Sequence, residues 1–151
     1  MNIVTLEDGS KWMIDVAFGG DGATKPIPLV SGHVTRNIGT QDRRLIRDHF
    51  SQQVDKGADK KLWIYQYRNG PEKGWNRFYA FPEIEVLPED FAVMNWSTGS
   101  NPLSFQTFTM LIVLFLRRGK EDGSGEEEVY GKRMLVNGIV KENLGGKTKV
   151  V

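Results

Sequence analysis

Two tight-turn signatures constrain this chain most, because each lies between runs of β-forming residues. The segment EDGS at residues 7–10 separates NIVTL from KWMIDV, and Asp8-Gly9 is a frequent hairpin pair. The segment NGPEKG at residues 69–74 separates KLWIYQYR from WNRFYAF, which are both rich in aromatic residues. Strands joined by such short turns pair antiparallel. The sequence therefore predicts a mainly β fold built from antiparallel hairpins.

One segment interrupts this strand-rich pattern. LPEDFAVMNW favours a helix, because Pro88 suits a first helical position and the acids after it suit the positive end of the helix dipole. We therefore expect a small β-barrel or sandwich at residues 1–86, a linking helix at 87–98 and a second strand-rich unit at 99–151.

Within the second unit we expect a long apolar strand at residues 105–116, a solvated glycine-rich loop at 117–128 and two closing strands. In the first unit, prolines make residues 25–34 an edge or irregular strand, and DRRLIRDHF is ambiguous between strand and helical turn. Because strands stand close to both ends of the sequence, we expect these residues to be a piece of something longer.

Composition excludes several classes of function. The 151 residues carry a formal net charge of +1, which gives no electrostatic case for binding nucleic acid or an anionic membrane. The longest apolar run, residues 108–116, is far shorter than the roughly 20 residues that span a bilayer. The chain contains no cysteine, so it has no disulfide, thiolate metal site or cysteine nucleophile of its own. A cytoplasmic location is the default expectation.

Asp15 is the first candidate for chemistry. Strand alternation places it on one face with Met13, while Trp12 and Ile14 lie on the other face. The alternation does not say which face is buried, so Asp15 is either a solvated strand residue or an inward acid that needs a partner.

The other candidates have simpler explanations. The glycine turn at residues 18–25 lacks the spacing of a phosphate-binding loop. His33 and His49 are the two histidines, and neither has the spacing of a metal ligand, so no metal site is predicted. The aromatic hairpin is either a nucleic-acid stacking platform or ordinary hairpin packing, and the charge balance favours packing. It interleaves two arginines with these residues: Trp63, Tyr65, Tyr67, Trp75, Phe78, Tyr79 and Phe81.

Three stretches together resemble the arylamine N-acetyltransferases, most closely their filamentous-fungal branch. They are WMIDVAFGGDGATKPIPL at residues 12–29, FYAFPEIEVLPEDFAVMNWSTGSNPLSFQTF at 78–108 and MLVNGIVKENLGGK at 134–147. In that family a strand ending in V-D-V-G-F-G carries the aspartate of a Cys-His-Asp triad, and Asp15 stands at that position. The resemblance implies a β-barrel followed by a partial C-terminal lid domain.

The resemblance also implies an activity. The family's cysteine takes an acyl group from acetyl-CoA or another acyl-CoA and passes it to an arylamine or hydrazine nitrogen. Asp15 would orient the histidine, Phe18 and Gly19 would line the acyl pocket, and Phe105 would contact substrate. Residues 20–25 would lie near the CoA entrance.

The sequence departs from the family in its catalytic residues. The family's cysteine lies in an N-terminal helical domain and its histidine lies just before the first hairpin, and neither is present in these 151 residues. His33 and His49 do not match the histidine position. Ala17 replaces a glycine of the motif, and STGSNPLSFQ has two residues more than the family's S-T-S-P-x-S-x-F.

Two functions therefore stay open. One is an acyltransferase fragment or shortened paralogue that is inactive alone. The other is a non-catalytic module that binds CoA, an aromatic ligand or a partner chain through apolar surface that a missing helical domain would leave exposed. A truncated gene model is a further alternative.

Overall fold

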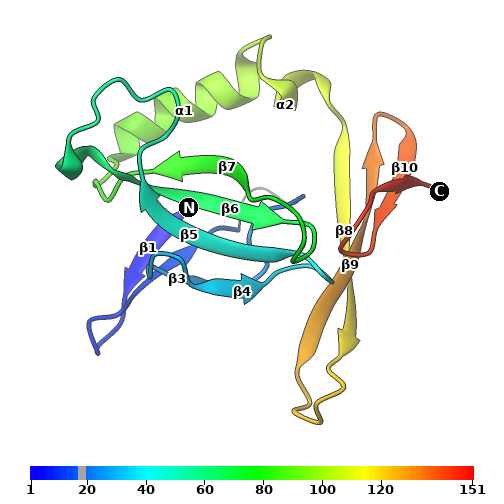
Figure 1. The fold of residues 1–151 in the computed structure, drawn as a ribbon. Helices are drawn as coiled ribbons and strands as arrows, with labels where there is room; N and C mark the ends of the chain where they lie inside the picture. Colours follow the sequence, from blue (N-terminus) through cyan, green and yellow to red (C-terminus); the bar gives the residue numbers. More distant parts are fainter. Residues whose placement is uncertain (17–19) are drawn as a thin grey trace.

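The computed structural model describes residues 1–16 and 20–151, which form three antiparallel sheets and a helical connector (Figure 1). The first sheet contains β1 (Asn2–Thr5), β2 (Lys11–Ile14) and β3 (Ile27–Pro28). The second sheet contains β4 (Val34–Arg36), β5 (Asp42–Asp48), β6 (Leu62–Arg68) and β7 (Asn76–Phe81), with the short helix η1 (Ala58–Lys60) before β6. The third sheet, in the order β11-β10-β9-β8, contains β8 (Leu111–Gly119), β9 (Glu127–Val136), β10 (Ile139–Asn143) and β11 (Lys149–Val150).

The mainly β prediction is confirmed, and both predicted hairpins form. Asn2 pairs with Ile14 across the first turn, and Trp63 pairs with Phe81 across the second hairpin. The ambiguous segment becomes β5, because it pairs along its whole length with the aromatic strand β6. Among the described residues no strand pairing joins the first sheet to the second, so a closed barrel is not seen.

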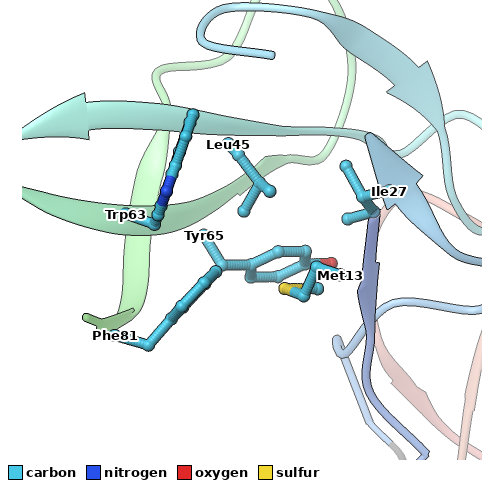
Figure 2. Close-up of a cluster of buried hydrophobic side chains, with 6 residues drawn as sticks. All are labelled: Met13, Ile27, Leu45, Trp63, Tyr65 and Phe81. Carbon is cyan, nitrogen blue, oxygen red and sulfur yellow. The ribbon is translucent and has the colours of Figure 1, made fainter. Parts of the chain in front are cut away.

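The core lies where the first sheet packs on the second. Figure 2 shows its six side chains converging from five strands: Met13, Ile27, Leu45, Trp63, Tyr65 and Phe81. Burying a side chain of this size stabilises the fold by about 1.5–3 kcal/mol. This core holds the end of β2, and with it Asp15, at a fixed place.

The helical connector consists of α1 (Pro88–Ser100) and α2 (Phe105–Phe108). Pro88 is the first helical residue of α1, as expected, and the Asp90 carboxylate accepts the Leu87 N–H at 3.0 Å. The helix runs two residues beyond the predicted end and has no buried residue. Figure 1 shows it lying along one side of the second sheet and leading to the third.

The prediction of a strand from Phe105 to Leu116 is wrong at its start. Residues 105–108 form a helical turn, and β8 begins at Leu111. Polar side chains decide this locally, because the Thr107 hydroxyl donates to the Ser104 carbonyl and the Ser104 hydroxyl donates to the Thr98 carbonyl. Such side-chain bonds to nearby backbone compete with strand formation.

The predicted loop at residues 117–128 is shorter than expected. Strand β8 continues to Gly119 and β9 begins at Glu127. Opposite charges face each other across this part of the ladder, with Arg118 Nε 2.7 Å from Glu128 Oε1. Cross-strand pairs of this kind favour continued pairing, which shortens the turn to residues 120–126.

Candidate active site around Asp15

Asp15 directly follows β2 on the core side of the first sheet. Met13, two residues earlier on the same face, is fully buried, whereas Val16 on the opposite face is exposed. The Tyr79 hydroxyl of β7 donates a hydrogen bond to Asp15 Oδ2 at 2.8 Å. The inward acid therefore has a partner, which is a tyrosine of the second hairpin.

Tyr79 is itself held by Tyr65. Their rings stack with centroids 5.1 Å apart and planes 12° from parallel, and the Tyr65 hydroxyl donates to the Asp21 carbonyl oxygen at 2.9 Å. Burial raises the pKa of Tyr79 above its usual range, and its hydrogen bond to Asp15 raises it further. Burial likewise raises the pKa of Tyr65. Both hydroxyls therefore remain protonated donors at neutral pH.

A cavity of about 280 Å³ opens beside Asp15. Three segments line it: Ile14–Val16 at the end of β2, Gly22–Pro26 of the loop, and Phe115, Arg117 and Val129 of the third sheet. Its volume is close to the lower end for small-molecule sites, which is about 300 Å³. Lys25 and Arg117 are the cationic side chains among the described lining residues.

The structure places the remaining predicted residues in different ways. Phe18 and Gly19 lie outside the described residues. Phe105 begins α2, is 45% exposed and is not among the described residues that line the cavity. The ring of His49 pairs with the Gly57 carbonyl at 2.8 Å, and His33 is exposed in the turn before β4. Neither histidine lines the cavity within the described part of the chain.

The aromatic hairpin resolves as packing. Trp63, Tyr65 and Phe81 are buried in the core, and their neighbouring rings contact one another within the hairpin. Trp75 is half-buried, and the Arg44 guanidinium carbon lies 4.0 Å from its ring centroid. The stacking-platform interpretation loses most of its aromatic surface, because every ring of the set except Trp75 lies in the core or packs against it.

The sequence did not indicate a buried polar network that lies next to the cavity. Asp21 Oδ1 accepts bonds from Lys132 Nζ at 2.8 Å and Gln41 Nε2 at 3.0 Å. Asn37 donates to Gln41 Oε1 at 2.6 Å and accepts from the Thr24 hydroxyl at 3.0 Å. Lys132 and Asp21 are 111 positions apart, so no local sequence signal connects them.

Within residues 1–16 and 20–151, no cluster of three or more acidic or histidine side chains is placed to hold a metal ion. No helix in that part of the chain is long and apolar enough to cross a membrane.

Comparison with known proteins supports the resemblance found in the sequence. A family model described as N-acetyltransferase matches residues 1–122. The chain belongs to the arylamine N-acetyltransferase family. It is 34% identical over 160 residues to N-malonyltransferase FDB2 of Fusarium pseudograminearum (strain CS3096), a match that covers all of this chain and 44% of the relative.

Two further similarities agree with this family. N-malonyltransferase FDB2 of Gibberella moniliformis is 33% identical over 149 residues, covering 95% of this chain and 42% of the relative. The solved arylamine N-acetyltransferase (NAT) from Salmonella typhimurium has the same fold over 99% of this chain and 45% of its own, with a TM-score of 0.70 and 23% identity. The chain thus spans less than half the length of the relatives it matches.

Proposed function

We propose that Asp15 is the orienting acid of a Cys-His-Asp triad in an acyl-CoA-dependent N-acyltransferase. The observation that carries this proposal is the position of the carboxylate, which is fixed by Tyr79 on the core side and exposed to a cavity on the other. In such a triad the aspartate selects the histidine tautomer and stabilises the imidazolium. The histidine in turn holds the cysteine as the thiolate that attacks the acyl thioester.

We propose that these 151 residues are inactive alone. They contain no cysteine, and the family's histidine position has no counterpart among them. Without the nucleophile and its base, residual rate comes only from binding and from oxyanion stabilisation. The cysteine and histidine must then come from polypeptide outside these residues.

The acyl donor is a CoA thioester and the acceptor is an arylamine or hydrazine nitrogen in this proposal. The relatives named N-malonyltransferase make malonyl-CoA the first donor to test beside acetyl-CoA. Phe18 and Gly19 remain our candidates for the acyl pocket and Phe105 for a substrate contact. The cytoplasmic location, and the division into a barrel domain (1–86), linking helix (87–98) and partial lid domain (99–151), likewise stay predictions.

An activity assay tests the proposal directly. The purified chain is mixed with acetyl-CoA or malonyl-CoA and an aromatic amine, and released CoA thiol is followed. We expect no turnover above the background without protein, and steady turnover by the chain alone would contradict the proposal.

A chimera tests the role of Asp15. The part of the Fusarium relative that precedes the matched residues is joined to this chain, and the active fusion is compared with its Asp15→Asn variant. We expect the variant to lose about 10⁴-fold in kcat, the size of the loss in a serine-protease triad. Asp122→Asn, in the exposed turn after β8, is the matched control and should retain activity.

A non-catalytic interaction module is the second candidate, and one observation favours it. The connector and β8 expose large apolar side chains, among them Phe91, Trp96 and Leu114. Such a surface is typical of an interaction site. Light scattering distinguishes the two: a monodisperse monomer with no affinity for CoA would count against the module.

A further inference from the structure

Asp21 lies where three parts of the fold meet. Its carboxylate oxygen Oδ1 accepts a bond from Lys132 of β9 and another from Gln41 in the turn between β4 and β5. Its main-chain oxygen accepts the Tyr65 hydroxyl of β6. One residue therefore contacts the third sheet, the turn before β5 and the middle of the second sheet.

Lys132 depends on this contact. It is 2% exposed, and lysine is almost never buried at that level unless its charge is paired. Within residues 1–16 and 20–151, its bond to Asp21 is the one ion pair that joins the third sheet to the rest of the fold. The other pairs of the third sheet, such as Arg133 with Glu142, lie inside it.

A backbone contact lies on the same seam. The Gly39 N–H donates to the Val129 carbonyl at 3.1 Å, and the Thr40 hydroxyl donates to the Gly145 carbonyl. A Cβ on Gly145 would lie 2.3 Å from the Thr40 nitrogen, so the two backbones touch. The third sheet is thus held to the second along a short, closely packed line.

This seam defines the cavity beside Asp15. Loop residues 22–26 form one wall, and Phe115, Arg117 and Val129 form the opposite wall. Asp21 immediately precedes the first wall, and Lys132 is three residues along β9 from Val129. The ion pair therefore joins the two segments that carry these walls, and neither of its residues is among the described residues that line the cavity.

The same residue connects to the carboxylate itself. Asp21 holds the Tyr65 hydroxyl, the Tyr65 ring stacks on Tyr79, and the Tyr79 hydroxyl bonds Asp15. Each step is a direct contact between packed groups.

We propose that Lys132 and Asp21 are a positioning pair, which fixes the separation of the cavity walls and, through Tyr65 and Tyr79, the orientation of Asp15. The pair acts through other residues and touches no reacting group. The inference rests on the proposed function only for the role given to Asp15.

The test uses the whole chain and three variants. Lys132→Met removes the charge at similar length, and Lys132→Arg keeps it. Arg133→Met is the matched control, because it removes a neighbouring ion pair that stays within the third sheet. Amide exchange is measured by NMR at Thr24 and Gly39, whose N–H groups bond across the network and the seam.

We expect Lys132→Met to speed exchange at both amides by about tenfold or more while the amide of the core residue Leu45 keeps its rate, as for a local opening. The chemical shift of the Asp15 carboxyl ¹³C signal should also change. Lys132→Arg should restore both readouts, and Arg133→Met should leave both unchanged.

Unchanged exchange in a folded Lys132→Met variant would overturn the proposal. So would an equal rise at Leu45, which indicates global destabilisation. If Lys132→Met does not fold, Asp21→Asn replaces it. This variant is the milder one, because the amide retains an acceptor oxygen and Asp21 is partly exposed. None of these readouts needs turnover, so the pair can pass its test even if acyl transfer fails.

Discussion

The first two sheets and the connector both contain large apolar residues, but the sheets bury them and the connector leaves them exposed. Leu45 and Tyr65 are fully buried between the sheets, whereas α1 buries no residue and leaves Trp96 68% exposed. The sheets complete their own core from residues 3–81. The connector and β8 present apolar side chains that nothing else in the described chain covers. The first region therefore buries its apolar side chains within this sequence, while the second region leaves its apolar side chains exposed.

The largest expected effect comes from making the same substitution, leucine to alanine, once in the core and once on β8. Leu45→Ala empties a packed core site and should lower the free energy of unfolding by about 2–5 kcal/mol. Leu114→Ala, at a residue 61% exposed on β8, should change it by less than about 0.5 kcal/mol. Urea unfolding followed by fluorescence measures both. Equal losses would mean that β8 is as well packed as the core.

Tyr79→Phe sharpens the comparison at the site itself. It removes the hydroxyl that bonds Asp15, and hydrogen bonds to charged groups contribute about 1.5–3 kcal/mol. We expect the free energy of unfolding to fall by an amount in that range. The carboxyl NMR signal of Asp15 should also shift, because the side chain would reorient. Tyr67→Phe is the control, since its ring packs edge-on against Phe78, and it should cost less. An unchanged Asp15 signal would contradict the role of Tyr79.

Alkaline pH should weaken the core through its tyrosines. The pKa values of Tyr65 and Tyr79 are higher in the folded chain than in the unfolded chain. The two tyrosines therefore contribute fully to stability below the unfolded pKa of about 10, and this contribution is lost as pH rises above it. Each tyrosine should then lower the free energy of unfolding by about 1.4 kcal/mol per pH unit. Urea melts between about pH 9 and pH 11 measure this slope. A double variant with phenylalanine at both positions should flatten it, and an unchanged slope would refute this explanation.

The smallest effect on stability is expected in α1. Trp96→Gln should change the free energy of unfolding by less than about 0.5 kcal/mol, because the ring is mostly exposed. It should instead reduce self-association, which light scattering over a concentration series would detect. Trp63 in the core provides the contrast, because Trp63→Gln should lower the free energy of unfolding by an amount comparable to Leu45→Ala. Undiminished association of Trp96→Gln would place the contact surface elsewhere.

Much of the fold was predictable because its signals are local. Asp8-Gly9 and the NGPEKG turn identify both hairpins, and Pro88 with its acids identifies the helix. The errors fall where local polar contacts override the apolar pattern, as at Ser104 and Thr107 before β8. Cross-strand charge pairing, which extended β8 to Gly119, depends on a register that the sequence does not state.

Only part of the site could be predicted, because only Asp15 has a local sequence signal. Alternation and the family motif single out Asp15, but the alternation does not say which face is buried. The partner, Tyr79, lies 64 positions away and is one of several tyrosines in its hairpin. The pair of Lys132 with Asp21 arises only when the third sheet meets the loop, so long-range geometry decides it.

The exposure of helix α1 determines where a protease would cleave the chain. A protease reaches α1 before any core strand, because none of its side chains is buried. A single cut there leaves two pieces, one with β1 to β7 and one with β8 to β11. The Gly39–Gly145 backbone contact and the bond from Lys132 to Asp21 would still join them. A nicked chain is therefore expected to migrate as one particle under native conditions and to separate only in denaturant.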